Sequence, residues 1–432
     1  MPTVAFHTLG CKVNQYDTQA MLERFVEEGY SVVPFDGPAD VYVLNTCTVT
    51  GTGDRKSLQI ARRIRREHPS SRLILCGCLA QKKGDQLFSV GADLILGTQR
   101  RGEIVSLLHQ VEKANVPLCA TSPLTDGTPF ERLCVTRQDE HTRATLKIQE
   151  GCNNHCTYCI IPSVRGPIRS REPADILSET LRLRDSGFTE LVLTGIHLAS
   201  YGKDWSDRSL TLLDAIHTVH SVEGIRRIRL GSLEPVIASE AFCRALSDMP
   251  KVCPQFHLAL QSGSDTVLRR MKRRYNTVQY LDAVDHIRAV FPHAALTTDI
   301  LTGFPGETEA EFRETCRFIE KVGYARIHVF PYSPREDTPA AVMPDQLNRA
   351  VKEQRARELI TLGQQVSRSY METWLGLESE IIPEEIVNGH WEGYTPEYIR
   401  VSLSGNQTCE NGVPVRIRIT SLNSRGMSGI IS

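Results

Sequence analysis

The chain has 432 residues, of which 41% are hydrophobic and 23% are charged, and its formal net charge is −1. This composition is typical of a soluble globular protein of two to four domains, and the near-zero charge excludes binding to nucleic acid through bulk charge alone. No apolar run reaches the length of a membrane span, and the start MPTVAFHTLGCK lacks the layout of a secretory signal, so we expect a cytoplasmic protein with no membrane partner.

Residues 1–116 predict alternating strands and helices. The segments TVAFHTLG, ADVYVLNTCTV, RLILCGCLAQ and ADLILGT are typical of buried strands. The segments QYDTQAMLERFVEEGY and TGTGDRKSLQIARRIRREHP carry apolar residues at helical spacing. This order predicts a doubly wound α/β domain built on a parallel sheet.

Three cysteines each follow a separate strand of this domain, namely Cys11, Cys47 and Cys78. Ligands of open α/β sheets gather at the carboxyl ends of the strands, so we expect these thiols to form a metal site. Cys76 lies inside its strand and is interpreted as a core residue. The 13 cysteines of the chain favour metal ligation over disulfides, because we expect a reducing compartment.

The rest of the chain predicts two further domains. Residues 117–141 are rich in Pro, Ser and Thr and predict a linker. Residues 142–371 repeat a strand-then-helix order about six times, which is typical of a partial or full parallel (β/α) barrel, and they end in a long helix. Residues 372–432 predict a small all-β barrel, because short strands alternate there with Gly, Pro and Asn turns.

The stretch EGCNNHCTYCIIPSVRG places Cys152, Cys156 and Cys159 at the end of the first barrel strand, on the face where barrel active sites are built. Closed iron–sulfur and structural zinc sites take four ligands, and this stretch offers three thiols. His155 is an alternative zinc ligand, but its place between two cysteines favours a loop residue. A 4Fe–4S cluster on three thiolates keeps one iron position open, as a catalytic site requires.

The C-x3-C-x2-C spacing, with Tyr158 before the last cysteine, resembles the signature of radical-SAM enzymes. The blocks TLGCKVNQYDT, VLNTCTV and LCGCLAQ are similar to the N-terminal domain of the methylthiotransferases within that group. The C-terminal segments EIIPEEIV and PVRIRITSLNSRG resemble a TRAM domain, a small β-barrel associated with RNA binding. The resemblance covers essentially the full length and implies a radical-SAM partial barrel in the centre of the chain.

This resemblance implies the cofactors and partners. It assigns a radical-SAM 4Fe–4S cluster to Cys152, Cys156 and Cys159. It assigns an auxiliary 4Fe–4S cluster to Cys11, Cys47 and Cys78. S-adenosylmethionine would chelate the open iron and serve as radical source and methyl donor, while the auxiliary cluster supplies sulfur. The implied partners are tRNA and an electron donor such as flavodoxin or ferredoxin.

Residues at the ends of barrel strands are candidate cofactor contacts by position, and no catalytic side chain is singled out. These candidates are Thr194, Gly195, Ser232, Glu234 and Gln261, with Asp299 in a similar place and Tyr158 expected near the adenine. The alternative for each is loop hydrogen bonding or a tight turn, and for Tyr158 it is packing beside the cluster. Gln149 and Glu150 end the first barrel strand, and the alternative to a site role is that both are simply polar residues at a strand end.

Two basic stretches are candidate RNA contacts, with a solvated helix face as the alternative. One contains Arg62, Arg63, Arg65 and Arg66, and the other is RRMKRRY from Arg269.

The blocks HTLGCKVNQYDT and CTVTGTGDRKS resemble the subgroup that acts on threonylcarbamoyladenosine beside the tRNA anticodon, which implies a 2-methylthio product at C2. The alternatives are the isopentenyladenosine subgroup, the subgroup that modifies an aspartate of a ribosomal protein, and a non-catalytic iron–sulfur RNA-binding protein.

Overall fold

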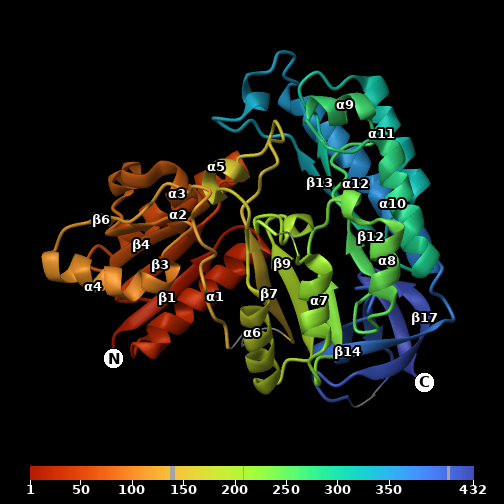
Figure 1. Cartoon of the computed structure of the whole chain (residues 1–432), viewed down its shortest axis with the longest axis horizontal. Coiled ribbons are helices and arrows are strands. Elements are labelled where there is room, and N and C mark those ends of the chain that lie inside the picture. Colours follow the sequence, from red (N-terminus) through yellow and green to blue (C-terminus); the bar gives the residue numbers. More distant parts are fainter. Residues whose placement is uncertain (137–141, 208, 406–408) are drawn as a thin grey trace.

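The computed structural model describes residues 1–136, 142–207, 209–405 and 409–432. Its elements form three sets in chain order: a parallel sheet flanked by helices, a partial barrel, and a small closed barrel (Figure 1). Among the helices in these ranges, none combines the length and hydropathy that a membrane span requires.

The N-terminal domain is a six-stranded parallel sheet in the order β2-β1-β3-β4-β5-β6. Its strands are β1 (Thr3–Thr8), β2 (Ser31–Val32), β3 (Val41–Thr46), β4 (Arg72–Gly77), β5 (Leu94–Leu96) and β6 (Leu118–Cys119). Its helices are α1 (Lys12–Glu27), α2 (Gly51–Glu67), α3 (Cys78–Lys83) and α4 (Ile104–Ala114). All six residues of β3 are buried, because helices cover both faces of the sheet.

The two faces of this sheet have separate cores, which is the doubly wound arrangement. Met21 and Phe25 of α1 pack with α4 residues on Val43. Ile64 of α2 packs with Leu44 on the opposite face. Alternate side chains of one strand therefore point to different helices, as the sequence predicts.

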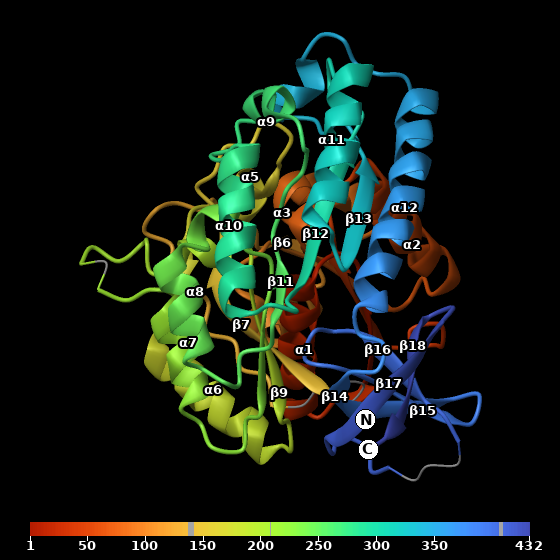
Figure 2. The ribbon, with the colours of Figure 1, turned by 90° about the vertical axis from the view of Figure 1, so that its right-hand side faces the viewer.

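The central domain is a partial barrel of two parallel sheets (Figure 2). The strands are β7 (Arg143–Glu150), β9 (Glu190–Gly195) and β10 (Arg227–Leu230) in one sheet, and β11 (Gln255–His257), β12 (Ala295–Thr302) and β13 (Arg326–Pro331) in the other. Parallel bridges between Ile228 and Val252 and between Leu233 and Leu258 join the two sheets. The two-residue strand β8 (Arg169–Ser170) pairs antiparallel to β7 and caps that edge.

Helices cover the outside of this partial barrel. They are α6 (Pro173–Asp185), α7 (Leu212–His220), α8 (Glu240–Ser247), α9 (Asp265–Arg270), α10 (Thr277–Val290), α11 (Glu309–Val322) and α12 (Arg349–Glu372). The short helix α5 (Ile161–Arg165) instead packs against α3 of the first domain (Figure 1). Short 3-10 turns occur at Gly84–Val90, Arg101–Glu103, Leu198–Ser200, Pro235–Ile237 and Pro339–Val342.

The C-terminal domain is a closed five-stranded barrel in the order β14-β15-β16-β18-β17. Its strands are β14 (Glu378–Val387), β15 (His390–Tyr394), β16 (Arg400–Leu403), β17 (Val415–Asn423) and β18 (Gly426–Ile431). Ile381, Val401, Ile417 and Met427 fill its interior. This small barrel packs at the N-terminal ends of β7, β9 and β10, away from the strand ends that carry the barrel cysteines (Figure 1).

The segment predicted as a linker is more closely packed than expected. Leu118 and Cys119 form β6 and extend the first sheet by one strand. Leu133 and Val135 are buried against Tyr16 of α1. Residues 117–136 therefore run along the interface between the first two domains, and residues 137–141 lie outside the described ranges.

Candidate functional site

The loop that carries the barrel cysteines folds back onto the barrel. Cys152 N donates to Gly166 O at 3.0 Å, and Cys159 N donates to Cys156 O at 3.0 Å. Thr157 N donates to Met271 O at 3.1 Å. These bonds gather the three thiols above the carboxyl end of β7, where the sequence predicts them.

An arginine outside this loop holds one of its sulfurs. Arg273 Nη1 donates to Cys156 Sγ at 3.1 Å, and its Nη2 lies 3.0 Å from Glu234 Oε1. The Arg273 side chain is only 8% exposed and stacks on Tyr275 at 4.8 Å. The prediction that Arg273 belongs to a phosphate-binding stretch is therefore wrong, because its charge is used inside the protein.

Glu234 is the centre of a polar cluster beside that loop. It accepts hydrogen bonds from His197 Nε2 at 3.1 Å and from Asn154 Nδ2 at 3.4 Å. Burial raises the pKa of Glu234, but the hydrogen bonds from these two residues and the charge of Arg273 outweigh it and lower the pKa overall. Sequence reasoning found Glu234 from its strand end but missed His197 and Asn154, because no spacing rule connects them.

The other strand-end candidates have different surroundings. Thr194 is buried and Ser232 is exposed. Gly195 is needed for close packing, since an added Cβ would lie 2.8 Å from Gln149 Cβ. Gln149 Oε1 accepts a hydrogen bond from His197 N at 2.6 Å. Gln149 therefore holds a neighbouring loop, which is the alternative to cofactor contact.

Two further candidates carry distinct signals. Gln261 has φ +68°, a left-handed conformation that is uncommon for a non-glycine residue, and its N donates to Asp299 O at 2.9 Å. Tyr158 packs against the apolar side chains of Phe304 and Tyr332. This is the packing role that we gave as the alternative to adenine contact. His155 is exposed in the loop.

The N-terminal cysteines meet at the carboxyl edge of the first sheet. Cys11 is the N-cap of α1, Cys47 follows β3, and Cys78 opens α3. An added Cβ on Gly10 would lie 3.3 Å from Cys47 Sγ, which places the first two loops in contact. Burial raises the pKa of Cys78 to about 11, the nearby Arg165 opposes this shift, and the thiols of Cys11 and Cys47 add to it.

Cys76 does not join this group. It is fully buried, and its Sγ lies 3.7 Å from Leu44 O. The prediction that Cys76 is a core residue is confirmed.

The donor chemistry of the two trios fits iron–sulfur clusters, which take thiolate ligands. Within the described ranges, no group of three or more His, Cys, Asp or Glu side chains is arranged to hold one metal ion. Both trios have sulfur-only donors, and N–H groups reach their sulfurs: Asn154 N reaches Cys152 Sγ at 3.4 Å, and Arg165 Nε reaches Cys78 Sγ at 3.3 Å. Such bonds are typical of cluster thiolates.

A buried ionic network runs from Cys78 to Glu150, two residues before the first barrel cysteine. Arg165, which follows the barrel cysteines in sequence, lies between Cys78 and Glu150. Asp17 and Lys147 extend the network, with Lys147 Nζ 2.7 Å from Asp17 Oδ1. All these side chains except Cys78 are at most 1% exposed, so the network forms the interface between the first two domains.

The four arginines predicted to contact RNA divide into two kinds. Arg65 donates to Gly91 O at 3.0 Å and Ser71 O at 3.0 Å and pairs with Asp93, so it holds the loops beside α2. Arg62, Arg63 and Arg66 are exposed on the same helix, although Arg63 lies 3.3 Å from Asp36. Arg65 therefore has a structural role, and the other three keep exposed charge.

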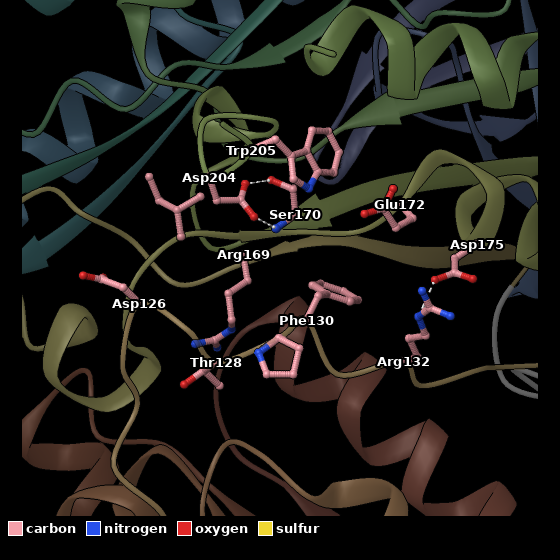
Figure 3. A pocket seen from close by; sticks show the side chains of 12 residues that line it. Asp126, Thr128, Phe130, Arg132, Arg169, Ser170, Glu172, Asp175, Asp204 and Trp205 are labelled. Carbon is pink, nitrogen blue, oxygen red and sulfur yellow. Dashed lines mark hydrogen bonds and ion pairs between the residues drawn. The ribbon is translucent and has the colours of Figure 1, made fainter. Parts of the chain in front are cut away.

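A cavity of about 250 Å³ lies beside β8, lined by Arg169 and Ser170 of that strand (Figure 3). Phe130, Trp205 and Arg169 line it, and Asp204 Oδ2 accepts from Ser170 N at 2.9 Å. None of the six predicted ligand cysteines lines this cavity.

The comparisons with known proteins agree with this arrangement. Residues 3–97 match the Uncharacterized protein family UPF0004, and residues 146–319 match the Radical SAM superfamily. The threonylcarbamoyladenosine tRNA methylthiotransferase MtaB of Bacillus subtilis is 42% identical over 414 residues, which cover 94% of this chain and 91% of that protein. The protein of the same name from Thermotoga maritima is 33% identical and covers 99% of this chain and 96% of its own length. The chain belongs to the radical-SAM methylthiotransferase family.

Solved structures support the fold of this methylthiotransferase. The radical S-adenosylmethionine methyltransferase TsrM from Kitasatospora setae superposes with a TM-score of 0.58 at 14% identity, covering 79% of this chain and 75% of that chain. The cobalamin-dependent radical enzyme OxsB gives a TM-score of 0.52 at 12% identity, over 85% of this chain and 56% of that one. Radical-SAM membership implies a 4Fe–4S cluster and S-adenosylmethionine as cofactors of the methylthiotransferase.

Proposed function

We propose that this methylthiotransferase adds a methylthio group to C2 of threonylcarbamoyladenosine next to the anticodon of tRNA. The observation that carries the proposal is the pair of three-cysteine sets on loops of adjacent domains, one at the end of β7 and one at the edge of the first sheet. Full-length relatives that carry this activity in their names support the choice of substrate.

In this proposal each side chain has a defined task. Cys152, Cys156 and Cys159 hold the radical-SAM cluster, and Cys11, Cys47 and Cys78 hold an auxiliary cluster. When bound, the clusters and S-adenosylmethionine supply the radical, the sulfur and the methyl group. Arg273 and Glu234 fix the loop that carries Cys152, Cys156 and Cys159. The residues that contact S-adenosylmethionine are Thr194, Gly195, Ser232, Gln261 and Tyr158.

The proposal also assigns the outer parts of the chain. Residues 1–116 form the auxiliary-cluster domain, residues 142–371 the radical-SAM barrel, and residues 372–432 a TRAM-like barrel that binds tRNA. An electron donor such as flavodoxin or ferredoxin reduces the radical cluster. The closed five-stranded barrel is consistent with an RNA-binding module of this kind.

Mass spectrometry of tRNA nucleosides tests the substrate. Cells that lack this protein are expected to lose 2-methylthio-threonylcarbamoyladenosine and to accumulate its precursor, while the isopentenyl product stays unchanged. Loss of the isopentenyl product instead identifies the other tRNA subgroup. A tRNA profile without change, together with an unmodified ribosomal-protein aspartate, identifies the third subgroup.

The Cys11→Ala substitution tests the auxiliary site. We expect the variant to keep formation of 5′-deoxyadenosine and to lose at least ~100-fold of the methylthiolation rate, because one ligand to the sulfur-donating cluster is missing. Both products are quantified by mass spectrometry after anaerobic reconstitution.

Cys316→Ala is the matched control for this test, since Cys316 is a half-buried thiol on α11 outside both trios. It should keep both activities. If Cys11→Ala still forms the methylthio product at the wild-type rate, the auxiliary-site assignment is wrong.

A further inference from the structure

The guanidinium of Arg165 contacts residues from three separate parts of the fold. Its Nε donates to Cys78 Sγ at 3.3 Å. Its Nη1 donates to both Glu150 carboxylate oxygens at 3.0 Å and to Asp17 Oδ2 at 3.2 Å, and its Nη2 donates to Asn14 Oδ1. The residue is fully buried, so these bonds hold the side chain in one orientation.

Arg165 also belongs to the segment that carries the radical-SAM cysteines. It is the last residue of α5, which begins two residues after Cys159. Val164, its neighbour, packs against Cys78, and Val164 O accepts from Thr98 Oγ1 at 2.9 Å. A single short helix therefore runs from one cysteine set to the other (Figure 1).

The contact with sulfur distinguishes Arg165 from the other cations of the network. Arg101 pairs with Asp17, with Glu131 at 2.8 Å and with Glu150 at 3.6 Å. Lys147 lies 2.7 Å from Asp17 and 2.8 Å from Glu150. Both carboxylates are thus already held by two other cations, and only Arg165 of the three donates to a cysteine.

We propose that Arg165 is a positioning residue for the auxiliary cluster, which fixes Cys78 through its N–H···S bond and raises the reduction potential of the cluster held there. This inference rests on the proposed function. A hydrogen bond and a buried positive charge next to a cluster sulfur favour the more negative, reduced form, and the reduction potential rises as a result. The same guanidinium ties the cluster to the radical-SAM loop, because it is part of that segment.

The test isolates the auxiliary site in the full-length chain. Cys152, Cys156 and Cys159 are replaced together by Ala, and the protein is reconstituted anaerobically with iron and sulfide. Arg165→Lys is then compared with Arg101→Lys in this background. Both substitutions shorten a buried cation of the same network, but only the first removes a donor to sulfur.

The readout is the midpoint potential from a titration followed by electron paramagnetic resonance. We expect Arg165→Lys to shift the midpoint to a more negative potential and to change the spectrum, and we expect Arg101→Lys to keep both as in the parent. A general loss of packing would affect the two variants alike. Equal potentials in the parent and in Arg165→Lys would overturn the inference.

A second measurement uses the parent chain, in which Cys152, Cys156 and Cys159 are Ala and Arg165 is unchanged. It does not depend on how Arg165→Lys or Arg101→Lys folds. With ¹⁵N-labelled arginine, pulsed electron paramagnetic resonance is expected to detect a nitrogen coupled to the reduced cluster, and absence of that coupling overturns the inference. Absence of iron from the parent overturns the auxiliary-site assignment together with this inference. Iron that is present without any coupling overturns the role of Arg165 alone.

Discussion

At the scale of single residues, the turn before Cys78 leaves no space for a side chain. Gly77 has φ +88°, and an added Cβ would overlap Asn45 Oδ1 and lie 2.6 Å from Thr46 O. Both neighbours belong to β3, so the backbone of β4 closely approaches the adjacent strand just where the cysteine is presented. Only glycine satisfies both the left-handed φ and this approach.

Gly77→Ala should therefore displace Cys78. We expect a loss of stability of about 1–2 kcal/mol for the left-handed alanine and about 1–3 kcal/mol more for the overlap. The iron content of the auxiliary site should fall with it. Thermal denaturation and iron analysis of the reconstituted chain measure the two effects.

Gly29→Ala is the control, because Gly29 has φ +82° and nothing lies within 4 Å of an added Cβ. It should lose only the first of the two contributions and retain full iron. If both variants lose iron equally, the close approach at Gly77 does not position Cys78.

The same scale shows what the sequence can and cannot predict. The places of the six cysteines in the fold were predictable because loop spacing and strand ends are local patterns, and their role as ligands stays a prediction. The contacts of Arg165 with Cys78 and of Arg273 with Cys156 join residues 87 and 117 positions apart, and no local pattern carries such information. Arg273 was predicted as a phosphate contact because its neighbours in RRMKRRY are charged, and burial decides otherwise.

At the scale of elements, three arginines at the N-terminal ends of barrel strands surround Glu190 of β9. Arg229 Nε lies 2.6 Å from Glu190 Oε1, and Arg143 and Arg227 each approach its carboxylate to 3.6 Å. Arg229 also donates to Thr395 O at 2.9 Å in the C-terminal barrel. Glu190 is therefore the buried carboxylate shared by the arginines that bind the two barrels together, and Glu384 and Glu380 of the C-terminal barrel pair with Arg143 and Arg227.

This arrangement predicts an acid-dependent loss of stability. Burial raises the pKa of Glu190, but the surrounding guanidiniums outweigh it and hold the pKa below the usual 4.5. A carboxylate with a lowered folded pKa stabilises the fold above pH 4.5, and that contribution disappears as the pH falls through the folded value. Glu190→Gln should cost about 3 kcal/mol at pH 7, and the difference from wild type should shrink below pH 4.5.

Urea denaturation followed by tryptophan fluorescence between pH 7 and pH 4 measures this difference. Two of the three tryptophans, Trp374 and Trp391, pack in the C-terminal barrel, so most of the signal reports on that domain. Glu240→Gln is the control, since its pair with Arg244 is about 70% exposed and should contribute less than about 1 kcal/mol. A constant difference across this pH range would exclude Glu190 as the titrating group.

Element prediction succeeded where segments are long and periodic. Strands β1, β3, β4 and β5 of the first sheet, the long helix α12 and the C-terminal strands β14, β16 and β17 lie where the sequence predicts them. The two-residue strands β2, β6 and β8 were missed, because they form through pairing with a distant strand and have no periodicity of their own. For the same reason the segment before β7 was predicted to be a linker, although Leu133 and Val135 pack against α1.

At the scale of the whole molecule, a net charge of −1 means that tRNA must be bound by local positive surfaces. Helix α2 presents Arg62 and Arg66 to solvent at the edge of the N-terminal domain, on the same domain as the auxiliary cysteines. Arg63 lies 3.3 Å from Asp36, and both Arg63 and Arg66 approach Glu67, to 3.9 Å and 3.0 Å. The Arg66 side chain is 74% exposed and that of Arg63 is 43% exposed, so Arg62 and Arg66 are the candidates for phosphate contacts that we test on this helix.

The double substitution Arg62→Ala and Arg66→Ala should weaken binding of unmodified tRNA and make it less dependent on salt. Two lost phosphate contacts correspond to a slope of log K against log salt that is shallower by about 1.5. Fluorescence anisotropy titrations over a range of KCl concentrations give this slope. Arg244→Ala removes an arginine that is 70% exposed on α8, on the outside of the barrel, and should leave the slope unchanged. If the double variant keeps the wild-type slope, helix α2 lies outside the tRNA interface and the phosphate contacts must come from another surface.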